Sequence, residues 1–191
     1  MPARKNCRII RTLALLCLGF GFVWSRPLFA QVHEAWMSSY PTNDFAAGQA
    51  YALAVDGSGN VFITGYDTVK YDANGHQLWN TNGGVALGLD AKGNVCIADT
   101  VRATNGESEL VTTKYDADGN LLWRSQYRGP ANLSDYVKAI AVDSAGNVCV
   151  TGTIDCDNPP CFQGITYSDF ATIRYSSNTT ATLFRLRCFL S

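Results

Sequence analysis

Histidine is scarce in this chain, and the motifs that would make a histidine catalytic are missing. His33 and His76 are the only histidines among 191 residues. The sequence contains neither a Gly-x-Ser-x-Gly elbow nor a His-Glu-x-x-His motif. Because catalysis needs groups that converge on a substrate, the sequence predicts that the protein is not an enzyme and uses no cofactor.

Helical periodicity is missing as well. No window after residue 30 repeats apolar residues with a period of 3.6, and Gly-Asn pairs interrupt the chain too often for helices. Between the interruptions lie β-branched and aromatic runs such as Val61-Phe62-Ile63, which suit strands. These patterns predict an all-β fold.

Basic residues are few outside the N-terminal segment. Residues 31–191 carry 10 Lys and Arg against 16 Asp and Glu, a net charge of about −6. A nucleic-acid-binding protein would show a basic stripe, and this chain has none. Nucleic acid is therefore not an expected partner.

Residues 1–30 differ from the rest of the chain. An apolar stretch over 13–24 is followed by the small residue Ala30, and it is preceded by four basic residues, Arg4, Lys5, Arg8 and Arg11. The stretch is shorter than the roughly 20 residues that a spanning helix needs. We therefore expect a secretory signal peptide cleaved before Gln31, rather than a membrane anchor, and a secreted or cell-surface protein without a transmembrane span.

A turn of the form Asp-x-x-Gly recurs along the remaining chain. Its five copies are Asp56–Gly59, Asp72–Gly75, Asp90–Gly93, Asp116–Gly119 and Asp143–Gly146. The aspartate of such a turn accepts hydrogen bonds from backbone amides two residues on, and the glycine takes a left-handed conformation. Three copies continue as Gly-Asn-Val, and the other two lie between Lys-Tyr and Leu-Trp. Two kinds of hairpin are therefore expected to alternate.

The spacing of these hairpins predicts propeller blades. Trp36, Trp79 and Trp123 are 43 and 44 residues apart, which is the length of one four-stranded blade. We expect strands at about 50–56, 60–66, 68–72 and 76–81. A second blade would cover about 85–127, with an insertion at 102–108, and a third would begin near Val137. The segment around Trp36 is expected to be a fourth strand without a blade of its own.

The combined pattern resembles a known repeat family. Ala-Val-Asp-x-x-Gly-Asn-Val is found at Ala54 to Gly65 and at Ala141 to Gly152, and Lys-Tyr-Asp-x-x-Gly-x-x-Leu-Trp is found within Thr68 to Trp79 and Thr113 to Trp123. Together these segments are similar to the SBBP repeat, a bacterial β-propeller repeat, over roughly 34–175. The resemblance implies an exported bacterial protein and brings no catalytic residues. The sequence departs from it at Ala98-Asp99, where Thr-Gly is expected, and after Tyr175.

These observations divide the chain into three parts: a signal peptide at 1–30, propeller-type repeats at 31–175 and a degenerate tail at 176–191. The repeats make about three blade equivalents, whereas closed propellers use about four to eight. Either the chain is a truncated piece of a longer propeller, or several copies assemble into a ring. The loss of periodicity after Tyr175 favours truncation.

Five cysteines follow residue 30: Cys96, Cys149, Cys156, Cys161 and Cys188. An odd number leaves at least one thiol unpaired. Cys156 and Cys161 bracket a short loop and could form a disulfide or remain free. Cys96 and Cys149 occupy equivalent repeat positions, too far apart for a disulfide. We expect both to be small buried residues within strands.

Two ligand hypotheses compete with structural roles. Asp116-Ala117-Asp118-Gly119-Asn120 is similar to the start of a calcium loop, but Tyr127 stands where an EF-hand needs glutamate. The repeated tryptophans could form a carbohydrate platform, although repeat-periodic aromatic residues more often pack between blades. We favour the structural role in both cases and predict no metal site.

The sequence predicts a non-catalytic structural or interaction module. Its contact surfaces would be the insertions at 102–108 and 155–167, and its partners other propeller chains, a cell-surface protein or a glycan. One alternative is a polysaccharide-binding or enzyme-accessory propeller, and another is a fragment without independent function. The first strands of the blades, at 50–55 and 137–142, are small and apolar, which favours packing over a central site.

Overall fold

The computed structural model describes residues 33–41, 48–129, 133–156 and 167–177. The chain divides into two compact units, residues 1–33 and 34–191, and the account that follows concerns the second. The predicted signal peptide, most of the predicted tail, Cys161 and Cys188 lie outside the described residues. Within the described ranges no helix is long and apolar enough to cross a membrane.

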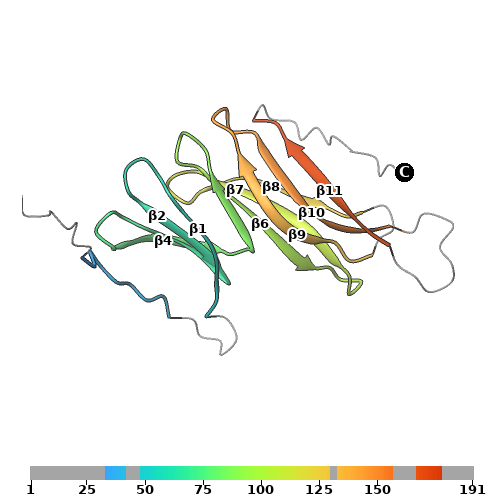
Figure 1. Cartoon of the computed structure of the whole chain (residues 1–191), viewed down its shortest axis with the longest axis horizontal. Helices are drawn as coiled ribbons and strands as arrows, with labels where there is room; N and C mark the ends of the chain where they lie inside the picture. Colours follow the sequence, from blue (N-terminus) through green and yellow to red (C-terminus); the bar gives the residue numbers. More distant parts are fainter. Residues whose placement is uncertain (1–32, 42–47, 130–132, 157–166, 178–191) are drawn as a thin grey trace, which may run out of the picture. The chain divides into compact units, whose positions relative to one another are not determined.

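In the described residues, eleven strands form three antiparallel sheets that follow one another along the chain (Figure 1). The first sheet contains β1 (Ala50–Val55), β2 (Val61–Gly65), β3 (Asp67–Tyr71) and β4 (Gln77–Asn82). The second contains β5 (Ala86–Leu89), β6 (Val95–Arg102), β7 (Ser108–Tyr115) and β8 (Leu121–Tyr127). The third contains β9 (Tyr136–Val142), β10 (Val148–Cys156) and β11 (Tyr167–Tyr175). The predicted all-β fold is thereby confirmed, and within each sheet every strand pairs with its neighbour in sequence.

The predicted insertion at 102–108 is the connection between β6 and β7. These strands remain paired up to Arg102 and Ser108, and a short turn at 103–107 joins them. The segment around Trp36 was expected to be a fourth strand, but residues 33–41 contain no strand. The Trp36 ring instead packs on Tyr71 of β3, with ring centroids 5.9 Å apart.

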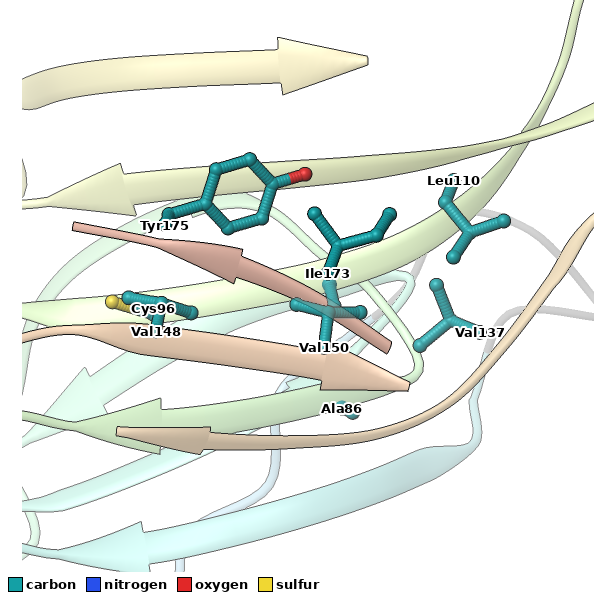
Figure 2. Packing of buried hydrophobic residues seen from close by; sticks show 9 residues of the cluster. Ala86, Cys96, Leu110, Val137, Val148, Val150, Ile173 and Tyr175 are labelled. Atoms are coloured by element: carbon teal, nitrogen blue, oxygen red, sulfur yellow. The ribbon is translucent and has the colours of Figure 1, made fainter. Parts of the chain in front are cut away.

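The core consists of two apolar clusters, one at each contact between successive sheets. The cluster between the first and second sheets contains Phe62, Leu87, Val95, Ile97 and Tyr115. The cluster between the second and third sheets contains Ala86, Cys96, Ala98, Leu110, Val137, Val148, Val150, Ile173 and Tyr175 (Figure 2). Because strand side chains alternate between faces, the second sheet contributes Leu87 to the first cluster and Ala86 to the second.

The two contacts repeat one arrangement of faces. The earlier sheet contributes what we call its small-residue face: Ala52, Ala54, Phe62 and Trp79 from the first sheet, and Ala86, Cys96, Ala98 and Trp123 from the second. The later sheet contributes its branched face: Leu87, Leu89, Val95, Ile97 and Tyr115 from the second sheet, and Ile140, Val142, Val148, Val150 and Tyr175 from the third. Each sheet therefore packs against the next through the same pair of surfaces.

The repeated tryptophans pack between sheets, as the sequence predicts. Trp79 donates from Nε1 to the carbonyl of Ala117 in the second sheet, 3.0 Å away. The ring of Trp123 lies 5.2 Å from that of Tyr175 in the third sheet. Trp36 has the same relation to Tyr71 of the first sheet. These rings therefore take part in packing contacts.

Candidate functional site

The structure places all ten predicted turn residues in turns of one geometry. Both Ser58 and Asn60 donate backbone N–H groups to Oδ1 of Asp56, and the Asn60 side chain donates to Oδ2 at 2.7 Å. Corresponding bonds to the aspartate are made in the turns of Asp72, Asp90, Asp116 and Asp143. The turn glycines have positive φ, for example +82° at Gly59, a conformation that glycine adopts without steric cost.

The donors around these carboxylates favour their charged form. The side chain of Asn120 contributes most to lowering the pKa of Asp116, and Asn147 does the same for the pKa of Asp143. In the second turn His76 replaces this asparagine, and its backbone N–H is the main cause of the lowered pKa of Asp72. The His76 side chain is 77% exposed, as expected of a turn residue.

The turn that is similar to a calcium loop is filled by its own donors. Both oxygens of the Asp116 carboxylate accept hydrogen bonds, from the amides of Asp118 and Asn120 and from the Asn120 side chain, at 2.8–2.9 Å. In the parts of the chain that the structure describes, no three His, Cys, Asp or Glu side chains gather as a metal site would require.

The two cysteines at equivalent repeat positions differ in exposure. Cys96 is fully buried in the contact between the second and third sheets, and burial raises the pKa of its thiol to about 12. Cys149 is free and partly exposed on β10, contrary to the expectation of burial. Cys156 ends β10 opposite Tyr167, and its predicted partner Cys161 lies outside the described residues.

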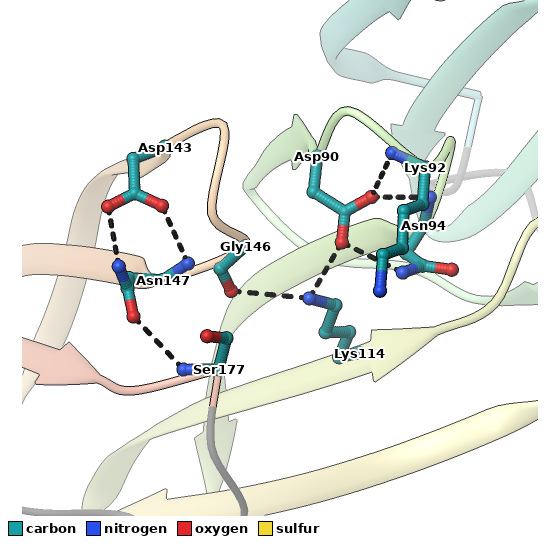
Figure 3. A network of polar contacts seen from close by, with 8 residues as sticks. All are labelled: Asp90, Lys92, Asn94, Lys114, Asp143, Gly146, Asn147 and Ser177. Carbon is teal, nitrogen blue, oxygen red and sulfur yellow. Dashed lines mark hydrogen bonds and ion pairs between the residues drawn. The ribbon is translucent and has the colours of Figure 1, made fainter.

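A buried ion pair within the second sheet lies at its contact with the third (Figure 3). Nζ of Lys114 lies 2.8 Å from Oδ2 of Asp90, and the two side chains are 7% and 4% exposed. The same ammonium donates to the carbonyl of Gly146 in the first turn of the third sheet, 3.3 Å away. Burial alone would raise the pKa of Asp90, but hydrogen bonds from Lys114 and Asn94 outweigh it and the pKa is lowered.

Lys70 occupies the equivalent position in the first sheet. Its ammonium donates to the carbonyl of Ala117 in the second sheet, at 2.8 Å. Lys70 and Lys114 therefore both attach one sheet to a turn of the next. Their equivalent placement makes these lysines links between successive sheets.

A groove of about 780 Å³ lies between the first and second sheets. Its polar and aromatic lining includes Tyr51, Tyr66, Asp67, Asn82, Asp99 and Arg124. Tyr51 and Tyr66 are 56% and 66% exposed. Burial raises the pKa of Asp99. A hydrogen bond from the backbone of Thr100 lowers it, but by less. The groove thus offers aromatic faces, an amide, a cation and two carboxyl groups to a ligand.

Asp99 lies where the repeat pattern breaks, and the structure explains why a side chain fits there. Its equivalents are Gly65 and Gly152, at which an added Cβ would lie only 2.0 Å and 2.2 Å from the carbonyl oxygens of Gln49 and Tyr136. Those carbonyls belong to chain that continues past a β-bulge in the first and third sheets. In the second sheet β5 pairs regularly and begins at Ala86, opposite Ala98. Strand β5 therefore does not extend far enough to pair with Asp99.

The sequence contained a signal for this groove. The departure at Ala98-Asp99 coincides with it, and so does a segment between Trp79 and Asp90 that is shorter than the equivalent segments from Trp36 to Asp56 and from Trp123 to Asp143. Neither observation pointed to Tyr66, Asn82 or Arg124, because these residues lie on other strands and loops and meet only in the folded chain. The predicted contact surface at 102–108 is a hairpin end, and most of the one at 155–167 lies outside the described residues.

Comparison with known proteins adds no assignment, since no protein-family model matches the chain and no curated protein is similar to it in sequence. The resemblance to the SBBP repeat therefore stays a prediction. The candidate site is therefore identified from the groove between the first and second sheets alone.

Proposed function

We propose that this chain is an exported, non-catalytic module built from propeller-type blades, and that it presents a binding surface. The blade interpretation is supported by three successive antiparallel sheets that pack through one repeated pair of faces. Blades of a propeller are four-stranded sheets arranged radially. The first two sheets have four strands and the third has three.

The groove between the first and second sheets is the observation that carries the binding role. It is the place where the sequence leaves its own repeat, and a carboxyl group occupies the space that the missing bulge opens. The repeated aspartates and lysines, by contrast, are engaged in turns and in contacts between sheets. The polar groups around Asp99 are thus the described groups best suited to an outside ligand.

The binding role is tested with glycan and peptide arrays. We expect a bound compound whose affinity falls at least about tenfold, or 1.4 kcal/mol, in the Tyr66→Ala variant. Asp99→Gly, which restores the repeat pattern, should also weaken binding. His76→Ala alters an equally exposed side chain outside the groove lining and serves as the matched control.

Either of two results would contradict this role. One is a ligand whose affinity is the same in the wild type, Tyr66→Ala and Asp99→Gly. The other is chemical turnover of a bound compound that Asp99→Asn abolishes, which would make the groove an active site.

A polysaccharide-binding domain is the second candidate. The exposed Tyr51 and Tyr66 rings beside Asn82 and Asp67 favour it, because tyrosine combines a flat apolar face with a polar group and amides and carboxylates bond to hydroxyls. In this case the glycan array, and not the peptide array, yields the ligand. Co-sedimentation with an insoluble polysaccharide should then be lost in Tyr66→Ala and kept in His76→Ala.

Export is tested separately, with a C-terminal alkaline phosphatase fusion and N-terminal sequencing of the purified product. We expect phosphatase activity outside the cytoplasm and a mature chain that begins at Gln31. An intact N-terminus on a chain retained in the cytoplasm would contradict export.

A further inference from the structure

In the described part of the chain, no sheet packs on the branched face of the first sheet. Leu53 and Val55 are 67% and 57% exposed. Their repeat equivalents in the second sheet, Leu87 and Leu89, lie in the contact with the first sheet, where Leu87 is 9% exposed. Leu53 and Val55 therefore occupy positions that the repeat buries elsewhere.

The small-residue face of the third sheet likewise has no described sheet packed on it. Phe170 is 83% exposed, whereas its equivalent Leu110 is 1% exposed in the contact with the third sheet. Ala139 and Cys149 share this face, since Ala139 pairs with Thr151 two residues after Cys149 and on the same side of β10. The chain thus carries two unpaired surfaces, and they are the two halves of the contact that it makes twice internally.

Residues 36–40 complete the first of these surfaces. Trp36 packs on Tyr71, and a Cβ added at Gly75 would lie 2.7 Å from the Trp36 ring. Tyr40 accepts a hydrogen bond from the Asn80 side chain at 2.8 Å. Trp79 has the same relation to Gly119 of the second sheet, where an added Cβ would lie 3.1 Å from the Trp79 ring. The segment therefore lies on the first sheet as the last strand of a preceding sheet would.

Among the residues that the structure describes, the third sheet has no strand in the place that this segment would take. Its order is β11-β10-β9, and β11 is an edge, whereas the equivalent β7 pairs with β8. In that pairing Lys114 faces Trp123 and Thr112 faces Ser125. The repeat places Arg174 and Thr172 at the positions of Lys114 and Thr112, and Trp36 and Ser38 at those of Trp123 and Ser125. The register between β11 and a second copy of residues 36–40 is thereby specified.

Charge supports the same arrangement. Arg174 is the equivalent of Lys70 and Lys114, each of which donates to a turn carbonyl of the following sheet. Arg174 is 49% exposed, and its nearest carboxylate is that of Asp143 at 3.9 Å. If the first sheet of a second copy packed on the third sheet, Arg174 could donate to the carbonyls of the turns in that first sheet.

We propose that the partner of these surfaces is a second copy of this chain, bound head to tail. The small-residue face of its third sheet packs on the branched face of the next copy's first sheet, and residues 36–40 of that copy pair with β11. The contact is heterologous, so it produces a closed ring where the rotation closes and a filament where it does not. Pairing also covers the exposed edge of β11. The groove ligand plays no part in this assembly.

Light scattering of the purified protein, with its N-terminus determined by mass spectrometry, tests the proposal. We expect a discrete oligomer or an open filament. Leu53→Asp blocks one surface and Phe170→Asp the other, and each variant alone should be monomeric. An equimolar mixture should form dimers, because one intact surface of each kind remains. Leu122→Asp, on the middle sheet and 50% exposed, should behave as the wild type.

Three outcomes overturn the proposal: a monomeric wild type, a mixture of the two variants that stays monomeric, or aggregates that neither variant disperses. Circular dichroism shows that each variant keeps its strands, which is expected since Leu53 and Phe170 are exposed. Peptide mapping after thiol alkylation provides a second measurement. Cys149 should be protected in the wild type and in the mixture relative to Phe170→Asp alone.

Discussion

At the scale of single residues, the carboxylates of this chain divide into two groups with opposite responses to pH. The turn aspartates accept several hydrogen bonds each, and their pKa values are lowered. Asp99 lies in the groove, and burial raises its pKa. The turn aspartates stabilise the folded state when they are ionised. Ionisation of Asp99, in contrast, lowers the stability of the folded state.

Removal of the Asp116 carboxylate should lower the urea midpoint at neutral pH, because three N–H donors lose their acceptor. Since the folded-state pKa of Asp116 lies below the unfolded value of about 3.9, its contribution is present above that value and is lost as the pH falls through the folded-state pKa. The difference between wild type and Asp116→Ala should therefore shrink below about pH 4.

Asp118→Ala is the matched control, because it removes a neighbouring carboxylate and leaves the backbone donor of residue 118 in place. An equal loss of stability in both variants would show that general charge, rather than the turn bonds of Asp116, is responsible.

Asp99→Asn should stabilise the fold at neutral pH. The raised folded-state pKa means that ionised Asp99 costs stability above that pKa, and that the wild type gains stability as the pH falls towards the unfolded value. The amide does not titrate, so the advantage of the variant should shrink on acidification. Urea unfolding at neutral and acidic pH checks this, and a variant less stable than the wild type at neutral pH would contradict it.

At the scale of the elements, the sheets are joined by specific polar links as well as by apolar surface. Lys114 reaches both Asp90 of its own sheet and Gly146 of the next. Trp79 combines apolar contact with a hydrogen bond to Ala117. The lysine lies on the third strand of its sheet, in the Lys-Tyr pair of the repeat. The tryptophan lies on the fourth strand, in the Leu-Trp pair.

Lys114→Met should cost about 3 kcal/mol, because it leaves the buried Asp90 carboxylate without its cation. The double variant Asp90→Asn with Lys114→Met should lose less than the sum of the two single variants. Chemical denaturation of all four proteins gives the coupling energy. Additive losses would mean that the two groups do not interact across the buried contact.

Trp79→Ala should also cost about 3 kcal/mol, as expected for a large aromatic side chain in a core contact. Trp36→Ala removes the equivalent ring at the outer face and serves as its comparison. Thermal unfolding of both variants is the measurement. If Trp79→Ala abolished binding of a glycan and left the melt unchanged, the tryptophans would be ligand contacts.

At the scale of the whole molecule, stability is distributed over repeated contacts between neighbouring sheets. The second sheet is the only described sheet with another sheet packed on both faces, since it contributes Leu87 to one cluster and Cys96 to the other. In such an array each unit depends on its neighbours. A further copy of the chain would therefore add most to stability if it packed on the outer face of the first or the third sheet.

Calcium should leave the melting temperature unchanged. The Asp116 turn has its carboxylate engaged by its own amides, so a cation would have to displace those hydrogen bonds. Thermal melts in millimolar calcium and in excess chelator check this. A higher melting temperature with calcium, lost in Asp116→Ala, would identify this turn as a calcium site.

The sequence by itself determined the all-β fold and the positions of the hairpins. An aspartate that accepts amides two and four residues on, such as Asp56, acts within one short turn. A glycine that takes positive φ, such as Gly59, acts there too. Chemistry confined to five residues can be predicted without knowledge of the rest of the chain.

Only the tertiary structure decided where the groove lies and which faces remain unpaired. Asp99 has room because β5 begins at Ala86 without the bulge that the other two sheets contain. Leu53 and Leu87 are equivalent in the repeat, yet one is exposed and the other buried. The physical reason is the same in both cases: burial and free space depend on which sheet packs alongside, and no local pattern contains that information.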